Sequence, residues 1–289
     1  MNRIYINSKI TIDKYILRYI YGLIPLIMYG IYKNGILLYN LNLINFLEIF
    51  KILYLLIISL IIYTIYCLIF KKKIKLNLEV LNILIIPLFM PPSVNILIYT
   101  ITLFIGLILN HYLSKVLKYN NTTFMILFIL LFLIIFKNYN YLNLAEATKS
   151  YSFSFLDLLF GRNTAGIASS SIIIGLLLII YFSIFTIYKK EITLSSIISF
   201  ILLIGLLNNF NIVNILNGNA ILSLILIAPD MLSTPIKRNE KIIYGIIIGL
   251  LSALLTQYID NYCGSIIAIL LISIIYNPIR KIDNLKKAC

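Results

Sequence analysis

The stretch Ala-Ile-Leu-Ser-Leu-Ile-Leu-Ile-Ala-Pro-Asp-Met-Leu-Ser-Thr-Pro, residues 220–235, decides how this chain folds. Its apolar part, residues 220–228, is only nine residues long, whereas a helix needs about 20 apolar residues to cross a bilayer. Pro229 and the carboxylate of Asp230 follow at once. If the chain lies in a membrane, the stretch predicts a helix that is broken there, and the role of Asp230 becomes the central question.

The composition places the chain in a membrane. Of its 289 residues, 61% are hydrophobic and 12% are charged, and the mean hydropathy is +1.01. A soluble globular domain has about 25% charged residues and fewer apolar ones. The apolar runs are continuous, without the alternation typical of strands, so we predict an all-α integral membrane protein. The eight predicted spanning helices are residues 15–32, 49–70, 95–117, 124–136, 166–188, 194–207, 242–259 and 265–279.

Two shorter apolar runs, residues 80–90 and 220–228, lie between the longer ones. Pro-Pro-Ser follows the first run, so both end in proline and small polar residues. Counting both gives about ten transmembrane helices, five in each half, with the short run third in each half. An odd number of crossings makes the second half enter from the opposite face. We therefore expect two inverted five-helix repeats, residues 1–138 and 164–289, each with a broken third helix near a central site.

The basic residues support ten crossings. With a cytoplasmic N-terminus, the inner side receives 19 of the 24 Lys and Arg residues, the excess that cytoplasmic loops normally carry. We therefore expect a multi-pass protein of the cell membrane, with both termini cytoplasmic and the loop around Thr148 outside. The net charge of +14 then reflects topology and anionic lipids, and does not indicate nucleic acid. The five basic residues left outside are Lys33, Lys51, Lys137, Lys149 and Arg162.

Asp230 allows two interpretations. In the first, it marks the mouth of a broken helix that faces the protein interior, because non-helical backbone survives in a bilayer only where protein or water satisfies it. Asp230, Ser233 and Thr234 would then line a path for an ion or a cofactor. In the second, Asp230 is a solvated cap at the inner interface, beside Lys237 and Arg238. The sequence leaves both interpretations open.

Motifs for enzymatic chemistry are missing from the sequence. The three cysteines show no paired spacing, His111 is the single histidine, and no cluster has the spacing of metal ligands, so we expect no metal centre. There is no Walker-type glycine loop, no dinucleotide fingerprint and no nucleophile with an obvious base. ATP hydrolysis by this chain is therefore excluded.

A run of small residues lies where the outer loop, residues 139–163, leads into the second half. Gly166, Ser169, Ser170 and Ser171 allow the backbone to approach closely, and amide groups at a helix start suit an anion such as a phosphate. Small residues also allow tight helix packing in membranes. Composition alone favours packing, and a cofactor phosphate is the alternative.

Several motifs occur in a recognisable order. Ala-Pro-Asp-Met-Leu-Ser-Thr-Pro, residues 228–235, is the most specific, and Leu-Phe-Met-Pro-Pro-Ser-Val, residues 88–94, places a proline pair in the third helix. The sequence resembles the RnfD/NqrB family, the large membrane subunits of Rnf complexes and of the Na⁺-translocating NADH:quinone reductase. The resemblance spans most of the chain and is strongest from residue 154 onward. The other matching positions are Asp157, Gly161, Gly166, Ser169, Ser170, Ser171 and Gly175, with residues 242–245, 263–265 and 277–279.

The resemblance implies a fold and a function. The fold is ten helices in two inverted halves, similar to urea and ammonium channels. The function is that of a subunit in a membrane complex that couples the oxidation of ferredoxin or NADH to movement of Na⁺ or H⁺. Family members carry FMN, esterified through its phosphate to a threonine in the outer loop, and the matching residue here is Thr148. The expected partners are the other subunits of the complex and the lipid bilayer.

The sequence departs from the family pattern around this threonine. Ala145 and Glu146 stand where the family has Ser and Gly, and the negative charge of Glu146 is unfavourable beside a phosphate. Residues 110–119 also lack the glycine-rich stretch that contributes to flavin binding in the family. Three hypotheses therefore stand: a redox-driven ion pump subunit with FMN on Thr148, a flavin-free transporter or channel for a small solute, and a scaffold subunit without cofactors.

Overall fold

The computed structural model describes residues 12–72, 77–117, 121–135, 155–161, 165–169, 171–186, 188–208, 219–230 and 234–286. All regular secondary structure in these residues is helical, as the sequence predicts. Five helices of this described part are long and apolar enough to cross a membrane, and shorter apolar helices accompany them. The chain is a multi-pass membrane protein. The five long helices are Asp13–Asn40, Phe46–Ile69, Ile96–Leu113, Lys190–Leu207 and Arg238–Tyr258.

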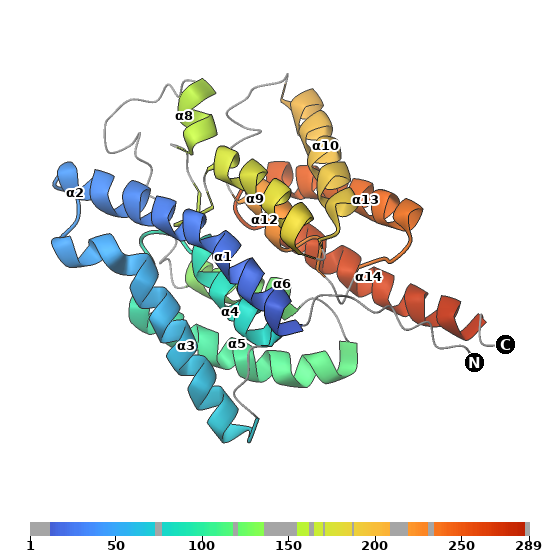
Figure 1. Ribbon diagram of the computed structural model, residues 1–289, viewed down its shortest axis with the longest axis horizontal. Coiled ribbons are helices and arrows are strands. Elements are labelled where there is room, and N and C mark those ends of the chain that lie inside the picture. The colour runs from blue at the N-terminus through green and yellow to red at the C-terminus, as the bar shows by residue number, and fades with distance from the viewer. Residues whose placement is uncertain are drawn as a thin grey trace.

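Figure 1 shows how the helices are arranged. Each of the ten predicted apolar runs overlaps a helix, and α8 is a short additional helix in the predicted outer loop. The first half contains α1 (Ile12–Ile31), η1 (Tyr32–Ile36), α2 (Leu37–Asn40), η2 (Phe46–Phe50), α3 (Lys51–Ile69), α4 (Leu78–Phe89), α5 (Ile96–Leu117) and α6 (Asn121–Ile135). Then follow α8 (Phe155–Phe160), α9 (Ile172–Phe185), α10 (Lys190–Leu207), α12 (Ala220–Leu226), α13 (Arg238–Tyr258) and α14 (Gly264–Lys286).

The first helix is longer than the sequence predicts. The predicted span ends at residue 32, but α1 continues without a break through the π-helical turn η1 into α2. Lys33, expected in an outer loop, is only 2% exposed. Its neighbours explain why the helix continues: the Asn34 side chain donates to the Ile167 carbonyl at 2.6 Å, and Gly35 packs directly against the backbone of Ile49. These polar residues are therefore accommodated by packing and do not end the helix.

The two short runs form helices that are too short to cross the hydrocarbon core. α4 has 12 residues and α12 has seven, about 18 Å and 10 Å against a core of about 30 Å. α4 begins where the Asn77 side chain accepts a hydrogen bond from the Val80 amide at 3.0 Å. It ends before Pro91, and α12 ends shortly before Pro229. Proline has no amide hydrogen; Pro87 is accommodated in the last turn of α4, but neither helix continues to the proline that follows it.

Helices α3 and α5, on either side of α4 in the chain, run in the same direction. Ser59 of α3 bonds the hydroxyl of Tyr99 in α5 at 2.6 Å. Two turns further along α3, Tyr66 meets His111, also further along α5, at 3.0 Å. α4 lies between these two parallel helices in the chain and packs against α3.

The same arrangement recurs around α12. A Cβ atom on Gly245 of α13 would lie 2.6 Å from the Ile192 carbonyl of α10, and Gly249 packs four residues later along α10, against Ser196. α10 and α13 are therefore parallel. α12 lies between these two helices in the chain and packs against both.

Matching helices of the two predicted halves are antiparallel. Arg18, early in α1, donates to the Phe185 carbonyl at the end of α9 at 2.7 Å. One turn later in α1, Gly22 packs against Tyr181, which lies one turn earlier in α9. These helices are the first of each half.

The short helices α4 and α12 show the same relation. The Phe89 carbonyl at the end of α4 accepts a hydrogen bond from Asn219, directly before α12, at 3.4 Å. Leu81, early in α4, lies near Leu226 at the end of α12, because both line one cavity. The two broken helices thus lie antiparallel beside each other.

Helix α9 begins later than the sequence predicts. Residues 166–171 were expected to open this helix, but α9 begins at Ile172 with the Ser171 side chain as its cap. The residues before it pair with the end of α4: the Ile167 amide donates to the Met90 carbonyl at 2.9 Å, and the Ala168 amide donates to the Leu88 carbonyl at 3.1 Å. The amide groups that a helix would use are therefore bonded to another helix end.

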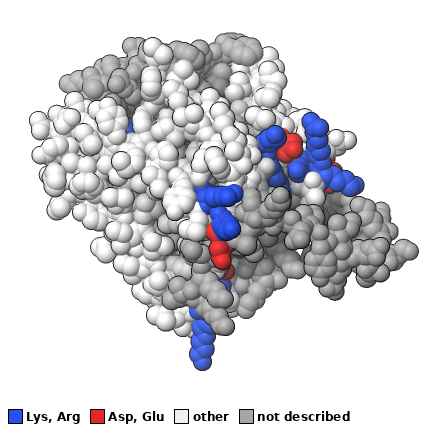
Figure 2. Space-filling model, viewed as in Figure 1, with Lys and Arg blue, Asp and Glu red and all other residues white. Residues whose placement is uncertain are grey.

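The surface agrees with burial in lipid. Among the described residues on the face in Figure 2, most are uncharged, and the Lys and Arg side chains in view gather at a few places, among them the region where α13 begins. Large apolar side chains face outward along the helices, such as Leu97 and Leu68, both 71% exposed. A water-facing surface would carry interspersed charges at such positions, so this surface fits contact with hydrocarbon.

Candidate functional site

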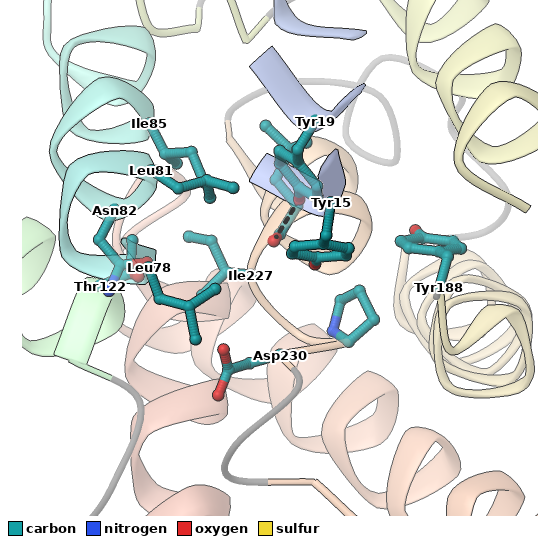
Figure 3. Close-up of a pocket in the computed structure, with 12 residues that line it drawn as sticks. Tyr15, Tyr19, Leu78, Leu81, Asn82, Ile85, Thr122, Tyr188, Ile227 and Asp230 are labelled. Carbon is teal, nitrogen blue, oxygen red and sulfur yellow. Dashed lines mark hydrogen bonds between the residues drawn. The ribbon is translucent and has the colours of Figure 1, made fainter. Parts of the chain in front are cut away.

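A cavity at the end of α12 collects polar groups from both halves of the chain (Figure 3). Its volume is about 30 Å³, enough for one or two water molecules or a small ion. α1, α4 and α6 of the first half meet the end of α12 and the start of the α9–α10 connection here. The lining residues are Tyr15, Tyr19, Leu78, Leu81, Asn82, Ile85, Thr122, Tyr188, Leu226, Ile227, Pro229 and Asp230.

Two tyrosines complete the broken end of α12. Pro229 has no amide hydrogen for the carbonyl four residues earlier, that of Ile225. The Tyr188 hydroxyl donates to this carbonyl instead, at 2.8 Å. The buried Tyr19 hydroxyl donates to the next carbonyl, that of Leu226, at 3.0 Å (Figure 3). The helix can therefore end inside the protein without leaving these carbonyls unsatisfied.

Asp230 stands directly beyond this broken end. Its backbone amide donates to the Ile227 carbonyl at 3.3 Å, and its half-buried side chain lines the cavity. Tyr15, Tyr19 and Tyr188 line the same cavity. Asp230 thus combines a half-buried side chain with a position at the end of a short helix.

Lys189 and Thr234 hold the backbone beside Asp230. The Lys189 ammonium donates to the carbonyls of Asp230 and Thr234, each at 3.3 Å, and to the Thr234 hydroxyl. The Thr234 hydroxyl in turn donates to the Asp230 carbonyl. Thr234 is 1% exposed, so this predicted site residue is part of the buried wall next to the cavity.

The polar groups that line the cavity are oxygens and amides, and apolar side chains of α4 and α12 complete its wall. A carboxylate, tyrosine and threonine hydroxyls and the Asn82 amide are hard donors, which suit Na⁺, H⁺ carried by water, or a small polar solute. The C-terminal end of α12 adds the negative end of a helix dipole. The site can therefore stabilise one positive charge inside the bundle.

A second polar cluster, the Asn219 junction, joins the two broken helices. The Asn219 side chain accepts hydrogen bonds from the Gly166 amide, at 2.9 Å, and from the Ser169 hydroxyl. It donates to the carbonyls of Phe89 and Tyr262, each at 3.4 Å. Asn219 is fully buried, and it connects the end of α4, the start of α12 and the segments before α9 and α14.

Two of the predicted cofactor-binding residues that the structure describes, Gly166 and Ser169, lie in this junction, and a third, Ser171, caps α9. Gly166 and Ser169 bond Asn219, and the Ser171 side chain accepts from the Ile174 amide at 3.4 Å. Their polar groups are thus engaged within the protein. A Cβ atom on Gly166 would lie 2.8 Å from the Leu88 carbonyl, so the glycine is needed for packing. Thr148, Ser170 and Ser233 lie outside the described residues.

Sequence reasoning missed several residues of both clusters. Asn82 was visible as a polar residue inside the short apolar run, and Asn219 stands directly before the other short run. Polar residues next to a break in an apolar run were therefore the available signal. Thr122, Tyr19 and Tyr188 gave no such signal. Thr122 and Tyr188 lie near helix starts, and both tyrosines are among the 22 of the chain, many of which are expected at the membrane interface.

The family comparison covers almost the whole chain. Residues 2–287 match the sequence model of the NQR2, RnfD, RnfE family, which agrees with the resemblance of the motifs described above. A search of curated proteins finds no match. The family consists of membrane subunits of Rnf- and Nqr-type complexes. Because the match spans both halves, the outer loop and both clusters, the chain belongs to the NQR2, RnfD, RnfE family.

Proposed function

We propose that the chain is the D-type membrane subunit of an Rnf-like complex, which couples electron transfer from ferredoxin or NADH to translocation of Na⁺ or H⁺. The family match supports a subunit of such a complex. The single observation that carries the ion path is the cavity at Asp230, where an acidic group stands at the end of a broken helix and both halves of the chain converge.

The architecture proposed with this function is a pair of inverted five-helix halves. The antiparallel pairs α1 with α9 and α4 with α12 support it, because a two-fold axis in the membrane plane relates matching helices in opposite directions. The parallel pairs α3 with α5 and α10 with α13 support the crossing of both short segments. In such folds the transport site lies beside the broken helices, and Asp230 directly follows the end of α12, which supports a role for Asp230 there.

Asp230 would hold the cation on its way through the bundle. Its carboxylate supplies the charge, and the Tyr15 hydroxyl and Asn82 amide replace part of the hydration shell. The Asn219 junction lies at the opposite end of α12 and fills the space there with hydrogen-bonded side chains and backbone. Access to Asp230 from that side would then require the junction to move, which is how a redox event elsewhere in the complex could control the path.

Replacing Asp230 by Asn tests the ion path. In the complete complex reconstituted into liposomes, we expect Asp230→Asn to lower Na⁺ or H⁺ uptake about tenfold or more, because a carboxylate beside a monovalent cation contributes more than 1.4 kcal/mol. Electron transfer should persist, since Asp230 supplies charge to the ion alone. The measurement is ion uptake for each electron transferred.

A matched control is Glu240→Gln. Glu240 is a half-exposed carboxylate on α13 whose partner is Lys237 at 3.1 Å, and it lies outside the cavity at Asp230. This variant should keep normal uptake. Normal uptake in Asp230→Asn as well would rule out Asp230 as part of the ion path.

The proposed flavin attachment rests on Thr148 alone. The described polar groups of Gly166, Ser169 and Ser171 bond within the protein, so they do not fit a phosphate. If FMN is attached, Thr148→Ala removes the hydroxyl that carries its phosphate, and the flavin fluorescence of the denatured chain in a gel should be lost completely. Thr164→Ala, a threonine further along the same region of sequence, should keep it.

The remaining outcomes separate the three hypotheses. A colourless wild-type chain would rule out bound flavin but would not test the proposed ion path. Rapid solute flux in liposomes that contain only this chain would favour a transporter or channel, because a redox subunit without its partners should be silent. Co-purification with the other subunits, without flavin and without ion uptake, would indicate a scaffold.

A further inference from the structure

Lys189 places its ammonium group among oxygen atoms beside the cavity. The atoms are the backbone carbonyls of Asp230 and Thr234, each 3.3 Å from Nζ, and the Thr234 hydroxyl oxygen. We call these three oxygens the Lys189 cage. Two carbonyls and one hydroxyl therefore converge on a single positive charge, next to the carboxylate that lines the proposed ion path.

The position of Lys189 in its own helix does not explain this arrangement. Lys189 is the N-cap residue of α10, and no side-chain hydrogen bond caps that helix. A positive charge is disfavoured at a helix N-terminus, where the dipole is also positive. The three oxygens of the cage belong to Asp230 and Thr234, which follow α12 in the chain. The start of α10 therefore does not by itself account for the position of the Lys189 ammonium group.

The chemistry of the cage is that of a monovalent cation site. Backbone carbonyls and hydroxyls at the ends of broken helices replace the hydration shell of Na⁺ and K⁺ in transporters and channels. They carry no net charge, so they suit a single positive charge better than a divalent ion. An ammonium group has a similar size and the same charge, and it can take the place of such a cation.

We propose that the Lys189 cage is a binding site for a monovalent metal cation, Na⁺ or K⁺, which the protein fills with its own ammonium group. The place of this site in transport rests on the proposed function: a cation that leaves Asp230 would exchange with the ammonium of Lys189 before it passes on. Lys189 then acts as a tethered cation that closes this side of the cavity when no metal ion is present.

The test removes the ammonium and offers metal ions in its place. The full chain with Lys189→Met is purified in detergent, and its unfolding temperature is measured in chloride salts of Na⁺, K⁺, ammonium or choline at equal ionic strength. A thiol-reactive dye reports unfolding, because Cys67 and Cys263 are buried, and Cys289→Ser removes the third thiol.

We expect Lys189→Met to unfold at a lower temperature than wild type in choline. Na⁺, K⁺ or ammonium at about 100 times its dissociation constant should raise that temperature by about 5 °C. Wild type should not respond, because its own ammonium occupies the cage. Choline is too large for the cage and provides the baseline.

Two further variants make the result decisive. Lys190→Met removes the adjacent, exposed lysine and should behave like wild type in every salt. If Lys189→Met does not fold, Lys189→Ala also leaves the cage open to a metal ion, and it should show the same selective response. Equal unfolding temperatures in all four salts for the folded Lys189 variant would overturn the proposal. The unfolding test is made without redox partners, so its result does not depend on the ion-uptake experiment with Asp230→Asn. The two proposals can therefore fail separately.

Discussion

Asn219→Ala is expected to destabilise the protein by about 3–5 kcal/mol, since each buried polar group that loses its partner costs about 1–3 kcal/mol. The Asn219 side chain is the common partner of four groups: the Gly166 amide, the Ser169 hydroxyl, and the carbonyls of Phe89 and Tyr262. Alanine leaves all four without this partner, and Asn219 is fully buried, so water does not replace it easily.

The measurement is the free energy of unfolding in detergent, with Asn208→Ala as control. Asn208 also makes side-chain hydrogen bonds, to the Ile204 carbonyl at 3.2 Å and to Gln257 at 2.8 Å. The bond to Gln257 is exposed, so water can replace it and the loss should stay below about 1 kcal/mol. Equal losses in the two variants would show that the Asn219 junction does not hold the broken helices together.

Asn219→Asp separates the two sides of the junction. Aspartate keeps an acceptor for the Gly166 amide and the Ser169 hydroxyl, but it has no donor for the carbonyls of Phe89 and Tyr262. It also buries a charge next to those carbonyls. We expect it to be at least as unstable as Asn219→Ala, and a milder effect would mean that the two long bonds at 3.4 Å contribute little.

The sequence predicts the helices well because their signal is local. A continuous apolar run longer than an ordinary strand can form only a helix in lipid, where every backbone group must be bonded within the segment. Proline ends α4 and α12 for an equally local reason, since it lacks the amide hydrogen. The short runs, the break before Asp230 and the position of Asp230 itself could therefore be predicted without a structure.

Long-range pairing accounts for what the sequence does not predict. Residues 166–171 are apolar or small enough to extend α9, and only the end of α4 explains why the Ile167 amide bonds Met90 instead. The sequence predicts Lys33 to be a loop residue, because the packing of its helix against Ile49 and Ile167 involves distant parts of the chain. The partners of a polar residue in a membrane lie on other helices, and one sequence does not identify them.

The candidate site divides in the same way. Asp230 and Thr234 are visible in a specific motif, whereas Lys189 reads as one more basic residue at the inner end of a helix. Its bonds to Asp230 and Thr234 bridge 41 and 45 residues. The tyrosines of the cavity are similarly hidden among the 22 tyrosines of the chain. Motifs therefore predicted the acidic group of the site but not the groups that surround it.

Gly249→Leu is expected to separate α10 from α13 and to destabilise the protein by more than about 3 kcal/mol, the upper range for overpacking a well-packed site. A Cβ atom at this position would collide with the Ser199 side chain and the Ser196 carbonyl. It would also lie 3.0 Å from the Phe200 amide nitrogen. Two of these atoms belong to the backbone of α10, so a rotamer change cannot relieve the clash.

The spacing of the small residues shows that α10 and α13 pack closely along more than one turn. Gly245 and Gly249 are four residues apart on α13 and face Ser195 and Ser199, four residues apart on α10. Small residues at this spacing let two membrane helices approach at backbone distance. A larger side chain anywhere along the contact between α10 and α13 must therefore displace one whole helix. Because α10 begins next to Lys189, that displacement would also reach the cavity.

Gly106→Ala is the matched control for Gly249→Ala, the milder form of this test. A Cβ atom on Gly106 of α5 would meet only the ring of Phe128, at 3.3 Å, which a small shift of the side chain accommodates. Alanine is favoured over glycine in a helix by about 1 kcal/mol, so Gly106→Ala should leave stability unchanged or raise it. Gly249→Ala gains the same propensity but must lose more to the clash. If both variants were equally stable in thermal unfolding, α10 and α13 would not pack at backbone distance, and the proposed crossing of the segment that contains α12 would lose its support.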